Sequence, residues 1–134
     1  MTTVLVLEDE PVVMRLARNI LKRHNVIEAA SGEEALLRFI DHDHRIDLLI
    51  ADVTLPRVSG IQVALLLRSR IPKLPVILTS GHPVSSWRTR DADDLERLGP
   101  DSVTVLQKPF PAEALRHAVS ELLGEPQTQS ARTV

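Results

Sequence analysis

The sequence has no cysteine and no tyrosine, and its aromatic side chains are limited to two phenylalanines and one tryptophan. The lack of cysteine excludes disulfides, thiolate metal sites and a cysteine nucleophile, and it fits a reducing compartment. The 16 basic and 18 acidic residues give a net charge of -2, and no long block carries one sign. Direct binding to nucleic acid is therefore not expected.

Long hydrophobic runs are absent as well. The apolar run from Val4 to Leu7 is far too short for a signal sequence or a membrane span, so we expect a cytoplasmic protein without membrane contact. At 134 residues and 43% hydrophobic, the chain can build one core. We expect one domain over residues 1–123 and a disordered tail over residues 124–134, where apolar periodicity is lacking.

Short aliphatic runs alternate with amphipathic stretches of helical length. The runs lack polar alternation, which is typical of strands buried on both faces of a parallel sheet. Strands and helices in alternation imply right-handed βαβ crossovers, so the predicted fold class is α/β: a doubly wound (βα)5 chain forming a three-layer α/β/α sandwich around a five-stranded parallel sheet. The expected strands are 4–7, 26–27, 48–51, 76–79 and 103–106, and the expected helices are 11–23, one opening at Ser31 with a capping-box spacing to Glu34, 59–70, 85–98 and 111–123.

Charged and hydroxyl side chains follow the strands at the point where each strand ends. In an open parallel sheet these positions meet at the crevice beyond the carboxyl ends of the strands. Carboxylates gathered there resist joint ionisation unless a cation bridges them, and an oxygen-only ligand set favours Mg²⁺ or Mn²⁺. Each residue alone has an ordinary alternative as a helix cap, a turn residue or a loop lysine. The residues are Glu8, Asp9, Asp52, Ser80 and Lys108.

Four motifs in this order resemble the receiver domains of two-component response regulators, including free-standing, chemotaxis-regulator-like ones, over residues 3–123. They are VLVLEDEP, DLLIADVTLPRVSG, LPVILTSGHP and LQKPF, and the second places Pro56 and Gly60 after Asp52. The last two motifs are most similar to receivers in hybrid sensor kinases and free-standing regulators. We therefore expect a phosphoacceptor domain of a two-component system.

The resemblance implies a role for each acidic residue. Asp52 would accept a phosphoryl group from a sensor histidine kinase or a phosphotransfer protein. The Mg²⁺ ligands would be Asp9, Asp52, Glu8 directly or through water, and Thr54 through its backbone carbonyl. Such a domain would not be an enzyme, apart from catalysing its own phosphorylation and dephosphorylation.

The same resemblance assigns the remaining site residues. Lys108 would contact the phosphoryl group, aimed by a cis bond to Pro109, and Ser80 would be the switch hydroxyl, with Thr79 as an interior strand residue. Val105 stands where the family often has Tyr or Phe, so we expect either plain core packing or altered signalling there. The output would be a contact with an unidentified downstream protein, and a homodimer remains open.

Other interpretations stay beside this one. A flavodoxin-like cofactor binder shares the architecture, but the acidic pair would repel an FMN phosphate. A Mg²⁺-dependent phosphohydrolase would need a cap for which the chain lacks length, and a pseudo-receiver scaffold would need a broken site. His82 either sets the phosphoryl lifetime together with Thr54 or is a plain loop residue, and residues 41–44 are interpreted as a solvated loop.

Overall fold

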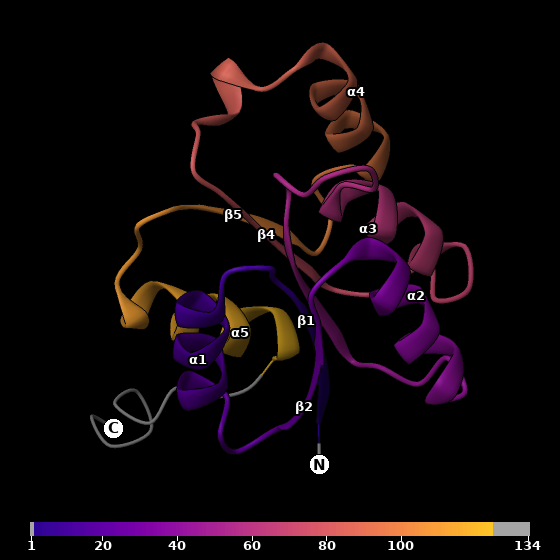
Figure 1. Cartoon of the computed structure of the whole chain (residues 1–134), viewed down its shortest axis with the longest axis vertical. Helices are drawn as coiled ribbons and strands as arrows, with labels where there is room; N and C mark the ends of the chain where they lie inside the picture. The colour runs from indigo at the N-terminus through magenta and orange to yellow at the C-terminus, as the bar shows by residue number, and fades with distance from the viewer. Residues whose placement is uncertain (1, 125–134) are drawn as a thin grey trace.

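The computed structural model describes residues 2–124, which form one parallel sheet with the strand order β2-β1-β3-β4-β5 (Figure 1). Strand β1 pairs with both β2 and β3, so the direction of winding reverses between β1 and β3. This reversal creates the crevice at which open α/β sheets bind their ligands. The strands are β1 (Thr3–Leu7), β2 (Asn25–Ala29), β3 (Leu48–Asp52), β4 (Val76–Ser80) and β5 (Val103–Gln107).

The unbroken aliphatic character of the strands follows from two separate cores. Along β1, Leu5 and Leu7 enter one core, while Val4 and Val6 enter the core on the other face. Every residue of β3 and of β4 is buried. A strand covered on both faces has no position at which a polar side chain could reach water, which explains the lack of alternation.

Helices cover both faces of the sheet (Figure 1). On one face Met14 and Leu115 pack with Val4 and Val6, and on the other face Ala35 and Phe39 lie in the core with Leu5. The predicted doubly wound, flavodoxin-like three-layer sandwich is therefore confirmed. The first face carries α1 (Pro11–Ile20) and α5 (Ala112–Leu123), and the second carries α2 (Gly32–Asp41), α3 (Gly60–Arg68) and α4 (Thr89–Leu98).

Two serines begin helices as the sequence indicates. The Ser59 hydroxyl accepts a hydrogen bond from the Gln62 N–H at 3.2 Å, and the Gln62 side chain accepts from the Ser59 N–H at 3.0 Å. Ser31 caps α2 by accepting from the Glu34 N–H, but the Glu34 carboxylate accepts from the Ala30 N–H. The capping box is complete at α3, whereas only its first half forms at α2.

The predicted helix over residues 85–98 is wrong at its start, residues 85–88. A short 3₁₀ turn, η1 (Val84–Ser86), comes first, Trp87 and Arg88 are extended, and α4 begins only at Thr89. The Trp87 indole N–H donates to the His82 carbonyl at 3.1 Å, which folds this segment back on itself. The polar stretch that begins at Thr89 is itself helical, and α4 is held on the core through Leu98 near its other end.

Helix α5 is the last element among the described residues. Helix α5 ends at Leu123 and is closed by Gly124, whose φ of 69° is in the left-handed region. The remainder of the predicted tail, residues 125–134, lies outside the described residues. Within residues 2–124, none of the helices has the length and apolar character needed to cross a membrane.

Candidate functional site

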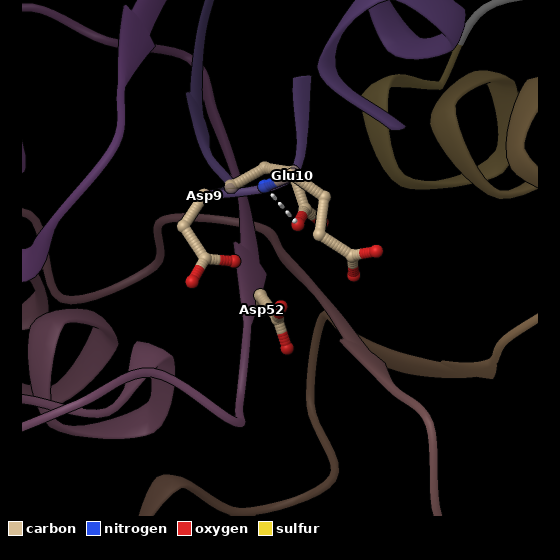
Figure 2. Close-up of side chains that lie close together, drawn as sticks. Asp9, Glu10 and Asp52 are labelled. Atoms are coloured by element: carbon tan, nitrogen blue, oxygen red, sulfur yellow. Dashed lines mark hydrogen bonds between the residues drawn. The ribbon is translucent and has the colours of Figure 1, made fainter. Parts of the chain in front are cut away.

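Four carboxylates meet at the carboxyl ends of β1 and β3, beside the point where the winding reverses. Glu8, Asp9, Glu10 and Asp52 each place one oxygen within 4.8 Å of the others. Glu8 and Asp52 are buried, while Asp9 and Glu10 are exposed. Figure 2 shows Asp9 and Glu10, from the segment after β1, lying beside Asp52 at the end of β3. The predicted meeting of the acidic residues is confirmed, and Glu10 joins them.

Lys108 supplies the positive charge of this cluster. Its Nζ lies 3.0 Å from Glu8 Oε1, 3.1 Å from Asp52 Oδ2 and 3.2 Å from Glu10 Oε1, and its side chain is 15% exposed. The Lys108 backbone N–H donates to the Ser80 carbonyl at 2.7 Å, and the bond from Lys108 to Pro109 is cis, as predicted. A residue far along the chain is thereby held among carboxylates from β1 and β3.

The charges of the cluster shift two pKa values. Burial raises the pKa of Glu8, although the hydrogen bond from Lys108 partly offsets this effect. Burial alone would lower the pKa of Lys108, but hydrogen bonds to Glu8 and Asp52 outweigh it and raise that pKa. One ammonium among four carboxylates leaves the cluster negative when all four are ionised. These oxygens are the ligands that a hard divalent cation prefers, so they are the residues that could hold one.

The loop after β3 is built tightly around Asp52. The Thr54 backbone N–H donates to Asp52 Oδ1 at 2.9 Å, which orients the carboxylate. Gly60 begins α3 so close to β3 that an added Cβ would lie 2.3 Å from the Asp52 carbonyl oxygen and 2.9 Å from Ala51 Cβ. A residue without a side chain is needed at this position because the helix backbone rests directly against the strand.

The end of β4 carries the two adjacent hydroxyls. Thr79 is paired in register with Asp52 and is buried within the strand, as predicted. Ser80 is 1% exposed, and its Oγ accepts a hydrogen bond from the His82 N–H at 3.1 Å. His82 itself is exposed in the loop that follows. The switch role of Ser80 and the lifetime role of His82 stay predictions.

Two further sequence interpretations concern Val105 and the histidine-containing loop. Val105 is half-buried in β5, where it stands opposite Leu78 in β4 and packs against the core, and altered signalling at this position stays a prediction. Residues 41–44 are exposed, with Asp41 ending α2 and residues 42–44 forming a turn before β3, and the centre of the His44 ring lies 4.7 Å from that of the Phe39 ring. This loop is at the opposite end of the sheet from the carboxylates.

The residue that sequence reasoning missed is Glu10. It is the third acid in Glu8-Asp9-Glu10. Because it lies just before Pro11, which starts a helix, its charge is explained equally well by the helix dipole. Its backbone N–H donates to Glu8 Oε2 at 3.1 Å, and its own carboxylate reaches Lys108. The turn after β1 therefore contributes three acids to the cluster instead of two.

Comparison with known proteins supplies a family. Residues 4–120 match the family model described as the response regulator receiver domain. The response regulator GtcR of Aneurinibacillus migulanus is 34% identical over 123 residues, which cover 90% of this chain and 47% of that protein. The transcriptional regulatory protein KdpE of Mycobacterium tuberculosis is 37% identical over 112 residues, covering 82% of this chain and 46% of that protein.

The solved structures agree with these relatives. A crystal structure of a response regulator receiver domain protein from Clostridium thermocellum has a TM-score of 0.76 and 25% identity, and the match covers 92% of this chain and 95% of that one. The chain spans less than half the length of GtcR and KdpE.

Proposed function

Because the chain belongs to the family of response regulator receiver domains of two-component systems, we propose that it is a phosphoacceptor switch whose phosphorylation site is Asp52. The observation that carries this proposal is the setting of the Asp52 carboxylate. It is 3% exposed, lies at the end of β3, and has Oδ2 3.1 Å from Lys108 Nζ within the carboxylate cluster.

In the proposed reaction an oxygen of Asp52 attacks the phosphorus of a phosphohistidine on a sensor histidine kinase or a phosphotransfer protein. The new O–P bond forms as the P–N bond breaks, and the histidine nitrogen leaves with the electron pair. Phosphoryl transfer depends mainly on positioning and on neutralising charge. Lys108 supplies positive charge beside Asp52, and the Thr54 N–H holds the carboxylate in place.

The donor set supports Mg²⁺, or Mn²⁺, as the cofactor. Asp9, Glu8 and Asp52 offer carboxylate oxygens within a few ångströms of one another, and the proposed fourth ligand is the backbone carbonyl of Thr54. Glu10 is an additional candidate because its carboxylate belongs to the same cluster. When bound, the cation supplies positive charge that neutralises the phosphoryl oxygens.

Ser80 is proposed to transmit the phosphorylation of Asp52 to the loop after β4. Its hydroxyl oxygen accepts from the His82 N–H in this structure. Once Asp52 is phosphorylated, the hydroxyl turns to donate to a phosphoryl oxygen, which weakens its hold on the loop after β4. The output is then a contact with a downstream protein, with no chemistry on a further substrate, and we keep the prediction that the domain works in the cytoplasm.

The test is phosphorylation by acetyl phosphate followed by intact-mass measurement. Wild-type protein with Mg²⁺ is expected to gain the mass of one phosphoryl group, while protein in EDTA and the variant Asp52→Asn are expected to gain none. Asp43→Asn, which changes an exposed carboxylate at the far end of the sheet, is the matched control and retains the gain. A gain of equal size in Asp52→Asn would show that another residue is the acceptor.

A separate measurement addresses the lifetime hypothesis for His82. The half-life of the phosphorylated protein is compared between wild type and His82→Ala after the donor is removed. A changed half-life supports a role in admitting or blocking the attacking water. An unchanged half-life leaves His82 as an ordinary loop residue.

A further inference from the structure

A cavity of about 590 Å³ adjoins the proposed phosphorylation site. One wall is the loop between β3 and α3, and the other is formed by η1 and the first turn of α4. Its apolar lining includes Leu55, Pro56 and Trp87, and Trp87 is half-buried. The volume is enough to enclose one or two large side chains of another molecule.

The charged residues around this cavity are mostly of one sign. Arg57, Arg88 and Arg90 line it, with Asp91 as the acidic member of the lining. All three arginines are exposed, and Arg57 is also paired with Glu33 at 3.5 Å, which leaves Arg88 and Arg90 as the main source of positive charge. Such a surface favours an acidic ligand through electrostatic complementarity.

Asp91 favours a ligand that also carries a hydrogen-bond donor. Its Oδ1 is the one side-chain oxygen or nitrogen that is buried without a hydrogen-bond partner among residues 2–124. A buried acceptor left without a donor costs free energy, so the carboxylate gains if the side chain turns toward the cavity that Asp91 lines and meets an N–H or O–H there. The cavity thus suits a ligand that combines an apolar group, negative charge and a hydrogen-bond donor.

We propose that this cavity binds an acidic peptide segment of the downstream partner. An apolar side chain of the segment enters beside Trp87, its carboxylates face Arg88 and Arg90, and a backbone N–H donates to Asp91 Oδ1. A peptide carries all three features in one chain. A nucleotide also could, but its phosphates would need donors held in place by the fold, and here the arginines are exposed side chains.

The two walls of the cavity begin next to Asp52 and Ser80, the two side chains that phosphorylation is proposed to change. The Thr54 N–H, at the start of one wall, donates to Asp52 Oδ1. The His82 N–H, at the start of the other, donates to Ser80 Oγ. A phosphoryl group on Asp52 and a turned Ser80 hydroxyl alter both hydrogen bonds at once. Peptide affinity is therefore regulated by phosphorylation, a step that rests on the proposed function.

Helix α4 is fixed at its carboxyl-terminal end and less constrained at its first turn. Its carboxyl-terminal end is fixed, because the Arg68 guanidinium donates to the carbonyls of Leu98 at 3.0 Å and Asp101 at 2.9 Å, and Leu98 is buried. Its first turn, which lines the cavity, has no side-chain cap. A shift of the cavity wall can therefore occur without detaching the helix from α3.

The experiment uses a fluorescent glutamate-rich peptide with a single central leucine, and binding is followed by fluorescence anisotropy. The double variant Arg88→Glu with Arg90→Glu is expected to weaken binding about tenfold, which is the effect of about 1.4 kcal/mol. Arg45→Glu reverses a single charge at an exposed site beyond α2 and is expected to change the affinity less than about twofold. A peptide with the leucine replaced by serine is expected to bind more weakly than the parent.

Phosphorylation is measured by intact mass in the same samples, so the two proposals can fail separately. A phosphorylated protein whose affinity differs about fivefold or more from that of the unphosphorylated protein supports the regulated cavity. If the arginine variant loses peptide binding but the protein takes no phosphoryl group, the result supports the site and overturns its regulation by phosphorylation. Equal binding by wild type and the arginine variant overturns the site. The peptide site is also overturned if wild type does not bind the peptide but binds a fluorescent ATP analogue that the arginine variant does not bind.

Discussion

Replacing Gly60 with alanine tests how closely α3 rests on the strand that carries Asp52. The new Cβ would lie 2.3 Å from the Asp52 carbonyl oxygen and 2.9 Å from Ala51 Cβ. Favourable contacts between carbon atoms begin at about 3.5 Å, and a backbone carbonyl cannot rotate aside as a flexible side chain can. The start of α3 must therefore move away from β3 by about 1 Å.

The expected loss of stability follows from two opposing effects. An alanine within a helix gains about 0.5–1 kcal/mol over glycine, and the gain is smaller at the first helical residue. Overpacking a well-filled interface costs about 1–3 kcal/mol, and α3 cannot move freely because Ile61 and Leu67 are fully buried beneath it. We expect the free energy of unfolding to fall by about 1–2 kcal/mol. Phosphorylation by acetyl phosphate should also slow, since Asp52 lies at the contact.

Urea denaturation measures this loss, and Gly81→Ala is the matched control. An added Cβ at Gly81 meets nothing within 4 Å. The control is expected to be unchanged or more stable by up to about 1 kcal/mol, because alanine restricts the unfolded chain. If Gly60→Ala is as stable as Gly81→Ala, α3 does not rest on β3 as described, and the reasoning is refuted.

Three further predictions concern the residues that hold the site and its surroundings. Arg68→Ala should lower the unfolding free energy by about 2–4 kcal/mol in urea titrations, because the part-buried carbonyls of Leu74 and Leu98 lose their donor. Arg70→Ala, at an exposed position, should stay within about 0.5 kcal/mol. Ser59→Ala should cost about 1 kcal/mol by removing the cap of α3, as read from thermal unfolding, and no change would contradict the cap. Burial raises the pKa of Glu8 above its ordinary 4.5, so the folded state binds the proton more tightly and stability in metal-free buffer should fall as the pH rises from 4.5 through the raised pKa. Glu8→Gln should remove that part of the slope, and an identical slope in the variant would contradict the assignment.

Much of the candidate site follows from the sequence because parallel strands place their carboxyl ends at one edge. Asp52 ends a fully buried strand, and Glu8 follows another, so their proximity requires only that both strands lie side by side in one sheet. Gly60 is similar, because its spacing from Asp52 belongs to the receiver motif and the close approach explains the spacing. Local patterns of this kind depend on few residues and survive differences elsewhere in the chain.

The break near Trp87 shows where local patterns fail. Residues 85–98 carry an almost continuous polar stretch of helical length, yet the chain becomes helical only from Thr89. The Trp87 side chain is tied to the His82 carbonyl, and helix α4 leans on α3 near Leu98. Those contacts join segments whose spacing the sequence does not reveal, and Trp87 and His82 also line the cavity beside Asp52.

By itself, the sequence determined the alternation of strands and helices, the doubly wound sheet and the identity of the acidic and hydroxyl residues at its edge. Periodic burial and strand polarity are sufficient for those features. Only the tertiary structure decided that Lys108 forms ion pairs with Glu8, Glu10 and Asp52, and that Asp91, beside a cavity lined by arginines, has Oδ1 without a hydrogen-bond partner. These depend on distances between side chains from different elements, which are set by how the helices pack on the sheet and not by any local stretch of residues.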